Sequence, residues 1–243
     1  MTARTVRIVH SSDIHVGDEG PHAPPGPGGL AALRAVLATA RDLAADLVLL
    51  AGDTFDHARM QAPTLRRATH LLAGAGRPVV LLPGNHDAAL PDCVFRRAGL
   101  QDLPHVAVLG VSHHDTLAFD ALDLEIWGRA HSGAGAFEPL GPPPPRCRRW
   151  QVAMAHGHYV APEDWAWASH RAWRIADAAL LAAEADYVAL GHWDRAVRVG
   201  PGEVRAWYSG APDLAGTVNL VTLGPNGVTV RQEALQWQEG KRA

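Results

Sequence analysis

The sequence predicts an α/β fold in which a parallel sheet packs against a second, mixed sheet. In the first half, short apolar runs alternate with segments of helical periodicity, an order typical of a parallel sheet covered by helices. The second half holds mostly strand-like segments and a hairpin turn. No internal repeat or composition shift marks a domain boundary, so we expect one domain over residues 1–243.

The first half carries the signals of the parallel sheet. Three nearly continuous apolar runs predict strands buried on both faces, namely residues 6–9, 47–50 and 79–82. Apolar residues at helical spacing predict an amphipathic helix over residues 30–44. Pro63, which suits a first helical turn, opens a second predicted helix over residues 63–72.

The second half supplies the candidates for the other sheet. Its strand-like segments are residues 106–109, 122–127, 152–155, 187–190, 197–199, 204–208, 218–223 and 228–231. Gly224 and Gly227 mark a hairpin turn between the last two. Residues 175–184 have a clear helical pattern. Residues 17–29 and 133–145 are rich in Gly and Pro and predict loops, the second a stiff polyproline spacer.

Composition narrows the class of protein. A formal net charge of -3 excludes a globally basic nucleic-acid binder, although a local basic patch remains compatible with it. Cys93 and Cys147 lie far apart, as expected for reduced thiols in a cytosolic protein. No apolar run approaches the ~18 residues of a membrane span, and no signal-peptide core precedes the first strand. We therefore expect a soluble cytoplasmic protein with no membrane partner.

Five short segments end apolar runs with acids, histidines or amides. They are Asp13-Ile14-His15, Gly52-Asp53-Thr54-Phe55-Asp56, Gly84-Asn85-His86-Asp87, His156-Gly157-His158 and Gly191-His192-Trp193-Asp194. Each offers oxygen or nitrogen ligands where a strand should stop and a loop begin, which is where α/β folds place their chemistry. Together they predict one metal site.

This ordered set resembles the calcineurin-like metallophosphoesterases, whose signature is DxH, GDxxD, GNHD, a lone histidine and GHxH. The match spans residues 13–194. The resemblance implies a four-layer α/β/β/α sandwich of two mixed sheets flanked by helices. It also implies an enzyme that hydrolyses phosphate esters by attack of a hydroxide that bridges two divalent metal ions.

The resemblance allots the ligands between two metals. A pair of dications about 3.5–4 Å apart offsets the charge of a phosphate ester and deprotonates a bridging water. Asp53 would bridge the two metals. The first metal would be completed by Asp13, His15 and Asp194, and the second by Asn85, His156 and His192. A bridging carboxylate with neutral amide and imidazole ligands suits this chemistry.

The GNHD segment has a catalytic role in the family. By resemblance, His86 contacts the phosphate and protonates the leaving alkoxide, a transfer that suits the intrinsic pKa of imidazole. Asp87 would hold the ring of His86 and stabilise its protonated form. Asp56 would steady a metal-binding loop from outside the ligand set, or else be a solvated loop acid.

Taken one at a time, these residues have simpler explanations. Asp13 or Asp53 alone could cap a helix, and Asn85 alone could be a turn residue. Joint occurrence favours ligand roles. His158 is either a substrate contact or an ordinary loop residue, and Arg129, which follows a predicted strand, is a candidate contact for an anion.

One position departs from the family pattern, since Asp194 stands where GHxH has its second histidine. Asp194 as a ligand would make the site one unit more negative than usual. A hard ion such as Mn²⁺ or iron would then be favoured at the first position over Zn²⁺. The alternative is that Asp194 does not ligate and the first metal is loosely held or absent.

Two later segments, Tyr187–His192 and Trp207–Pro212, are similar to the SbcD-type DNA repair exonuclease branch. That branch has a capping domain which this chain is expected to lack. The expected substrate is therefore a smaller phosphodiester, a nucleotide or a single-stranded nucleic acid. Trp165, Trp167 and Trp173, interleaved with arginines, either stack bases or cover a sheet edge.

Two other functions stay open. A phosphomonoesterase or protein phosphatase would use the same metals on a different ester. A degenerate family member could instead serve as a non-catalytic binding scaffold, although retention of His86 and nearly every ligand favours an enzyme.

Overall fold

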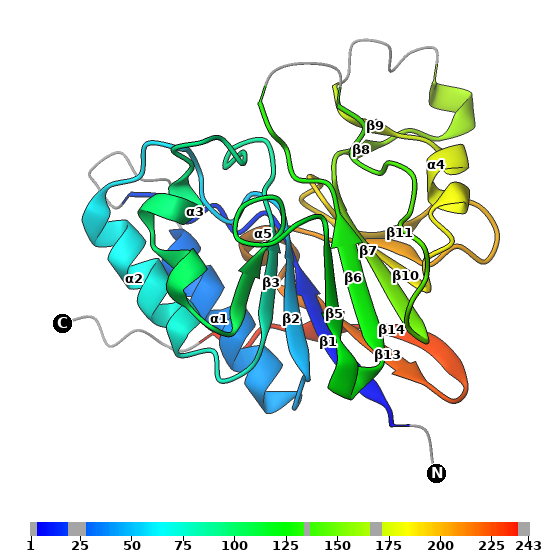
Figure 1. The fold of residues 1–243 in the computed structure, drawn as a ribbon, viewed down its shortest axis with the longest axis horizontal. Helices are drawn as coiled ribbons and strands as arrows, with labels where there is room; N and C mark the ends of the chain where they lie inside the picture. The colour runs from blue at the N-terminus through cyan, green and yellow to red at the C-terminus, as the bar shows by residue number, and fades with distance from the viewer. Residues whose placement is uncertain (1–3, 19–27, 134–136, 166–171, 238–243) are drawn as a thin grey trace.

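The computed structural model describes residues 4–18, 28–133, 137–165 and 172–237, and these residues form two six-stranded sheets packed face to face (Figure 1). A pair of short strands, β8 (His158–Tyr159) and β9 (Arg174–Ile175), lies beside the second sheet. Both large sheets are mixed, and helices flank them, as predicted.

The first sheet has the strand order β14-β13-β1-β2-β3-β4. Its parallel part consists of β1 (Val6–Ser11), β2 (Leu47–Ala51), β3 (Val79–Leu82) and β4 (Val106–Val108). The hairpin strands β13 (Thr217–Gly224) and β14 (Gly227–Ala234) run antiparallel, and Gly224 pairs with Gly227 at the predicted turn.

The second sheet has the order β11-β12-β10-β7-β6-β5. Its parallel strands are β6 (Leu124–Gly128), β7 (Trp150–His156), β10 (Tyr187–Gly191) and β12 (Ala206–Ser209). The antiparallel edges are β5 (Thr116–Phe119) and β11 (Ala196–Val199). The polyproline stretch at residues 142–145 forms no helix or strand, as expected.

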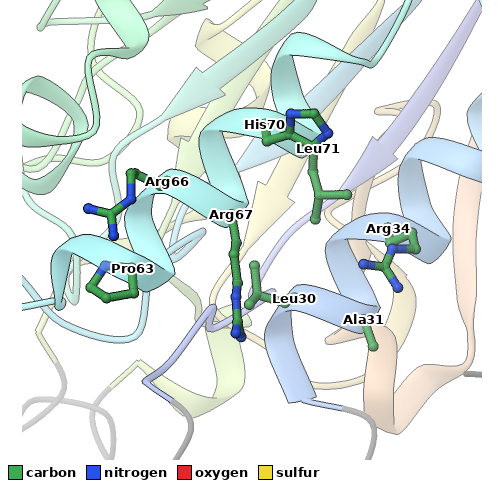
Figure 2. A pocket seen from close by; sticks show the side chains of 8 residues that line it. All are labelled: Leu30, Ala31, Arg34, Pro63, Arg66, Arg67, His70 and Leu71. Carbon is green, nitrogen blue, oxygen red and sulfur yellow. The ribbon is translucent and has the colours of Figure 1, made fainter. Parts of the chain in front are cut away.

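Two amphipathic helices, α1 (Gly28–Asp42) and α2 (Ala62–Ala73), cover the outer face of the first sheet. The helices pack beside each other and leave a groove on their solvent side (Figure 2). The short helix α4 (Asp177–Ala182) covers the second sheet. The remaining short elements are α3 (Val94–Arg97), α5 (Pro212–Ala215) and 3₁₀ turns at Leu100–Asp102, Asp120–Leu122 and Pro162–Asp164.

The side chains of β1 point alternately to the two faces of the first sheet, and this shows how the layers pack together. Val9 faces the helices, whereas Val6 and Ile8 face the second sheet, and all three are buried. Tyr187 of β10 meets this interior from the other side. Each such side chain contributes about 1.5–3 kcal/mol when it leaves water, so the two apolar faces fix how the sheets pack.

The structure corrects the sequence prediction at several elements. The sequence pattern places the 106–109 and 218–231 strands in the second sheet, but β4, β13 and β14 belong to the first. The strand β13 lies inside the first sheet, between β14 and β1, and it presents apolar side chains to both neighbouring layers. The edge strand β5, the pair β8–β9, and the short helices α3 and α5 are not predicted by the sequence pattern.

Cys93 and Cys147 are both free thiols, as predicted. Within the described ranges, no helix combines the length and the apolar character needed to span a bilayer.

Candidate metal centre

The predicted site residues follow strands whose carboxyl ends meet at one edge of the two sheets. Asp13 and His15 follow β1, Asp53 and Asp56 follow β2, and residues 85–87 follow β3. His156 is the last residue of β7, and His192 follows β10. Because β1, β2 and β3 are parallel, as are β7 and β10, their ligands are delivered to the same end of the molecule.

Backbone hydrogen bonds join the loops after β1 and β2. The amide N–H of Asp13 donates to the Gly52 carbonyl at 3.0 Å, and the amide of His15 donates to the Asp53 carbonyl at 3.0 Å. Asp13, His15 and Asp53 have φ angles of 53°, 48° and 49°. A left-handed backbone at these non-glycine residues costs about 1–2 kcal/mol each, so the folded loops hold strain where their side chains converge.

Three glycines of the motifs make room for the site. A Cβ atom at Gly52 would collide with the ring of His156, and one at Gly84 would collide with the carboxylate of Asp53. At Gly191, a Cβ atom would meet the Ala51 carbonyl oxygen and the His156 ring. The glycines that precede Asp53, Asn85 and His192 are therefore required by close approach, and Gly52 is also required by its positive φ of 93°.

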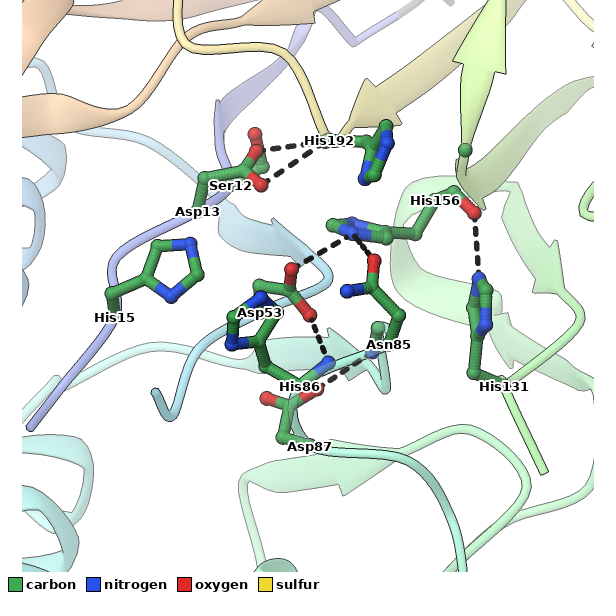
Figure 3. A network of polar contacts seen from close by, with 12 residues as sticks. Ser12, Asp13, His15, Asp53, Asn85, His86, Asp87, His131, His156 and His192 are labelled. Atoms are coloured by element: carbon green, nitrogen blue, oxygen red, sulfur yellow. Dashed lines mark hydrogen bonds and ion pairs between the residues drawn. The ribbon is translucent and has the colours of Figure 1, made fainter. Parts of the chain in front are cut away.

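His156 lies at the centre of the site and is fully buried. Its Nδ1 donates to the carbonyl oxygen of Ala51 at 2.9 Å, which leaves Nε2 facing the ligand side chains (Figure 3). That nitrogen is 3.1 Å from Oδ2 of Asp53 and 3.1 Å from Oδ1 of Asn85. The other Asp53 oxygen accepts the amide N–H of His86 at 2.9 Å.

Nε2 of His156, Oδ2 of Asp53 and Oδ1 of Asn85 therefore direct lone pairs towards one another. This arrangement is favourable only when a cation lies between the three atoms. Without a metal, that cation is a proton on His156. Burial alone would lower the pKa of His156, but the charge and hydrogen bond of Asp53, together with the charge of Asp13, outweigh burial and raise this pKa to about 9. Burial opposes ionisation of Asp53, yet the charge of His156 holds the Asp53 pKa below its usual range.

The opposite side of the site is formed by Asp13 and His192. Both carboxylate oxygens of Asp13 accept the backbone N–H of His192, at 3.1 and 2.9 Å (Figure 3). Burial raises the pKa of Asp13. Burial, followed by the charge of His156, lowers the pKa of His192 to about 4, so its ring is a neutral ligand near neutral pH.

A more exposed group contains His15, Asp56 and His86. Oδ1 of Asp56 is 3.3 Å from Nδ1 of His15 and 3.9 Å from Nδ1 of His86. The two imidazole rings meet edge to face, with centroids 4.8 Å apart. Nδ1 of His15 is buried, yet it makes no hydrogen bond within the described residues. A buried imidazole nitrogen without a hydrogen-bond partner can ligate a metal in its deprotonated form.

In the described part of the chain, ligand atoms gather into groups that could hold an ion. One group is Asp53, His156 and His192, and another is Asp13, His15 and Asp53. The third is His15, Asp56 and His86. The first two share Asp53, and their mixture of carboxylate oxygen and imidazole nitrogen suits divalent transition metals.

Comparison with known proteins identifies the family. The family model for calcineurin-like phosphoesterases matches residues 6–195 of this chain. The chain belongs to the calcineurin-like phosphoesterase family. This confirms the family predicted from the ligand motifs, whereas the SbcD-type branch stays a prediction.

Solved structures share the fold of this phosphoesterase. One crystal structure aligns with a TM-score of 0.60 at 14% identity, covering 96% of this chain and 100% of the other. The crystal structure of TT1561 from Thermus thermophilus aligns with a TM-score of 0.59 at 13% identity, covering 94% of this chain and 99% of the other. No curated protein sequence matches the chain significantly.

Asp87 is placed differently from its prediction. It is fully buried, and its carboxylate accepts the amide N–H groups of Gly84 at 2.7 Å and Phe55 at 3.0 Å. His86 instead directs Nδ1 to the backbone oxygen of Asp56 at 2.7 Å. The contacts of these two residues therefore give no support to the prediction that Asp87 holds the ring of His86. In this phosphoesterase, Asp87 ties the loop after β3 to the loop after β2.

The remaining predicted residues lie at the margin of the phosphoesterase site. The Asp194 side chain is exposed and belongs to none of the metal-holding groups found among the described residues. Arg129 packs against Gly141 and Phe137, and its side chain donates to the Glu138 carbonyl oxygen. The roles predicted for Asp194 and Arg129 are thus not supported by their contacts.

Aromatic side chains border His192. Trp193 stacks on buried Tyr208 with ring centroids 4.4 Å apart, and its Nε1–H donates to Nδ1 of His158 at 2.9 Å. The ring of Trp173 lies 6.0 Å from that of His192. Sequence reasoning assigned no role to Trp193, although its place between His192 and Asp194 could have suggested one. Of the other predicted tryptophans, Trp165 is 41% exposed and Trp167 is outside the described residues.

His131, like Arg129, follows the strand that ends near Trp127, and the sequence suggests it only as a weaker candidate for an anion contact. It is buried, its Nε2 donates to the backbone oxygen of His156 at 2.8 Å, and its ring lies edge to face with that of His156. Burial lowers the pKa of His131 to about 4, so the ring is neutral near pH 7. His131 therefore supports the end of β7 from behind the site.

Proposed function

We propose that this phosphoesterase is a dinuclear metal-dependent phosphodiesterase. The observation that carries the proposal is the position of Asp53, the acid shared by two groups of metal-holding side chains in the described residues. A carboxylate placed in this way can bridge two cations through its two oxygens.

The residues present fit two dications. Asp13, His15 and Asp53 would hold one, and Asp53, Asn85, His156 and His192 would hold the other. When bound, the metals would polarise the phosphoryl group and lower the pKa of the attacking water. The carboxylate and imidazole ligands at the first position suit Mn²⁺, iron or Zn²⁺. We leave Asp194 out of this ligand set.

His86 is suited to protonate the leaving group. Its Nδ1–H donates to the Asp56 carbonyl oxygen, which orients the ring. The His86 side chain is 45% exposed, so a substrate can reach it. This proton transfer contributes typically a factor of about 10²–10⁴ to the rate. The role predicted for Asp87 thus falls to the backbone of Asp56.

The aromatic border favours phosphodiesters that carry rings. Trp193 and Trp173 lie beside His192, and an Arg195 guanidinium lies 5.1 Å from the centroid of the Trp193 ring. Flat aromatic faces bind nucleobases by stacking, at about 1–3 kcal/mol per base. This supports a nucleotide or nucleic-acid diester as the substrate, with His158 at the edge of its path.

The direct test is hydrolysis of bis(p-nitrophenyl) phosphate by the purified protein with added Mn²⁺. We expect turnover that falls by about 10²–10⁴ in His86→Ala. Asp53→Asn should reduce bound metal from two ions to one or fewer by elemental analysis, with a rate loss of at least about a thousandfold.

Two outcomes would overturn the proposal. Faster turnover of p-nitrophenyl phosphate than of the diester would show a phosphomonoesterase. An absence of hydrolysis with Mn²⁺, Fe²⁺ and Zn²⁺ alike would favour a non-catalytic scaffold of the same fold.

A further inference from the structure

The space between the two sheets changes from apolar to polar as it approaches the metal centre. Val6 and Ile8 of β1 fill its apolar part. The next two positions on the same face are His10 and Ser12, and both side chains are fully buried. Ser12 directly precedes the ligand candidate Asp13 (Figure 3). Buried polar side chains cost free energy unless they are hydrogen-bonded, so their partners matter for the packing of the sheets.

Both polar side chains have a partner in the second sheet. Nδ1 of His10 is 2.8 Å from the hydroxyl oxygen of Tyr187 in β10. Burial lowers the pKa of His10 to about 3, so the ring is neutral and its Nδ1 can accept the hydroxyl hydrogen. The hydroxyl oxygens of Ser12 and of Ser209 in β12 are 2.9 Å apart. Tyr187 and Ser209 are also fully buried.

A third link between the sheets comes from Asn219 of β13, which pairs with His10 in the first sheet. Its buried amide nitrogen donates to the Tyr208 carbonyl oxygen in β12 at 3.2 Å and to the Tyr187 hydroxyl oxygen at 3.4 Å. Strands β1 and β13 are thus both tied to the second sheet just below the metal centre. We call these side chains the inter-sheet cluster, which consists of His10, Ser12, Tyr187, Ser209 and Asn219.

The two proposed metals differ in which sheet supplies their ligands. The candidate ligands of the first metal all follow strands of the first sheet, namely Asp13, His15 and Asp53. The second metal takes candidate ligands from both sheets, Asp53 and Asn85 from the first and His156 and His192 from the second. Only the second metal therefore depends on how the sheets are placed relative to each other.

Close packing limits how near the sheets can come at this end. A Cβ atom at Gly191 of β10 would overlap the Ala51 carbonyl oxygen and approach the Cβ atom of Ser12 to 2.9 Å. Apolar contacts are not directional and resist sliding only weakly. Hydrogen bonds weaken steeply with distance and angle, so the inter-sheet cluster restrains both separation and sliding.

We propose that the inter-sheet cluster positions the ligands of the second metal. The proposal rests on the proposed function, because it takes the dinuclear centre as its starting point. Metal ligation tolerates deviations of only about 0.2 Å in ligand distance. A small shift of one sheet against the other would therefore weaken the second metal while the first keeps its ligand geometry. The cluster residues act as positioning residues and touch neither metal nor substrate.

The first test measures the affinity of each metal separately. The double variant Tyr187→Phe, Ser209→Ala removes two hydroxyls of the cluster and changes no ligand. Binding of Mn²⁺ to the metal-free protein is followed by isothermal titration calorimetry. The binding step lost in His192→Ala identifies the second metal, and the step lost in His15→Ala identifies the first. In the double variant, we expect the second metal to bind at least about tenfold more weakly and the first within about twofold of the unaltered protein.

A matched control removes the same chemical groups where they do not join the sheets. The Tyr159 hydroxyl donates to Asp177 at 2.7 Å, and the Ser112 hydroxyl oxygen accepts the Val108 amide N–H at 3.0 Å. The double variant Tyr159→Phe, Ser112→Ala should leave both metal affinities within about twofold. An unchanged second metal in the cluster variant would overturn the proposal. Equal weakening of both metals, or the same weakening in the control, would show general loosening and would also overturn it.

The single variants guard the test against misfolding. Thermal unfolding of each protein shows whether it is folded at the temperature of the titration. If the double variant is not, Tyr187→Phe and Ser209→Ala are titrated separately. Each should weaken the second metal and spare the first, and two single variants that bind the second metal as the unaltered protein does would contradict the proposal.

The second test separates this proposal from the proposed function. In the cluster variant, the Mn²⁺ concentration for half-maximal hydrolysis of bis(p-nitrophenyl) phosphate should rise at least about tenfold. The value of kcat should recover at saturating Mn²⁺ to within about threefold of the unaltered protein. A kcat that stays as low as that of His86→Ala would contradict a positioning role. If the unaltered protein binds two Mn²⁺ ions and the cluster variant behaves identically, only the cluster proposal fails. If the unaltered protein binds fewer than two ions, the proposed function fails.

Discussion

His156 and Asp53 approach each other across the two sheets, with Nε2 and Oδ2 3.1 Å apart. The contact joins the end of β7 in one sheet to the loop after β2 in the other. The Nδ1–H of His156 donates a hydrogen bond to the Ala51 carbonyl oxygen. In a neutral ring, Nε2 would therefore present a lone pair to the carboxylate of Asp53. A cation is therefore needed at this contact, and either a proton or a metal ion can supply it.

This contact predicts how stability depends on pH in the metal-free protein. The pKa of His156 rises from 6.5 to about 9 on folding, so the folded chain holds a proton that the unfolded chain releases. The resulting stability is fully present below pH 6.5 and is lost as pH rises through about 9. The free energy of unfolding should fall by at most about 1.4 kcal/mol per pH unit in this window.

Urea unfolding of the chelated protein between pH 7 and 9.5 measures this decline. Titration of Asp87 contributes little to the change of unfolding free energy above pH 7. Burial, followed by the charge of Asp53, raises the pKa of Asp87 only to about 7. Saturating Mn²⁺ should abolish the decline and release a proton on binding, since the metal takes the proton's place. A pH-independent stability in EDTA would contradict the ion pair.

The contacts of Asp87 predict a structural role for this residue. Its two oxygens each accept one backbone N–H, from Gly84 and Phe55. Asp87→Asn would turn an NH₂ group towards one of these donors and should lower the free energy of unfolding by about 1–3 kcal/mol. Metal affinity should fall as the two loops loosen.

The effect on kcat at saturating Mn²⁺ distinguishes this role from a partnership with His86. We expect kcat of Asp87→Asn to stay within about threefold of the unaltered protein, because Asp56 supplies the backbone oxygen at Nδ1 of His86. A loss of kcat as large as the loss in His86→Ala, which is measured alongside, would show that Asp87 acts through His86 after all.

Gly52 is predicted to be essential for the metal centre. Its φ angle is 93°, and a Cβ atom there would overlap the ring of His156. Gly52→Ala should therefore cost about 3 kcal/mol of stability and displace the histidine from Asp53. Gly76→Ala is the matched control, since Gly76 also has a positive φ of 68° but nothing within 4 Å of its Cβ position.

Thermal unfolding and metal content, measured on both variants, distinguish the cost of a strained left-handed backbone from the effect of a collision with the ring of His156. Gly76→Ala should lose about 1 kcal/mol, the cost of a left-handed alanine, and keep its metal. Similar losses of metal in the two variants would mean that the close approach to His156 is unimportant.

The ligand loops could be predicted from the sequence because each is a local signal. A buried strand, a glycine and a polar ligand follow one another within a few residues, and parallel strands bring such ends together. Contacts between distant segments leave no such mark. The bonds from Asp87 to the loop after β2, and from His131 to His156, depend on how the loops pack, which a linear pattern does not contain.

The same reason explains why the sequence pattern places the hairpin of β13 and β14 in the wrong sheet. The apolar residues among 217–224 indicate that β13 is buried, but they do not say which sheet the strand joins. Pairing with β1 is favoured because Val218 and Leu220 then pack under the helices while Val221 and Leu223 fill the space between the sheets. The edge strand β5 has alternating exposure and only four residues, too little periodicity to stand out.

Asp194 allows a test of how far the family pattern extends in this chain. Its carboxylate is exposed and outside the metal-holding groups of the described residues, while Asp13, His15 and Asp53 already form one group. We therefore expect Asp194→Ala to retain two metal ions and to hydrolyse bis(p-nitrophenyl) phosphate within about twofold of the unaltered protein.

Asp194→His, which restores the histidine of GHxH, should keep or raise the activity because its longer side chain can reach the first metal. Metal content by elemental analysis, with steady-state rates on the same samples, measures both effects. Loss of one metal ion in Asp194→Ala would show that the aspartate ligates when metal is bound, and the first metal would then have three carboxylate ligands.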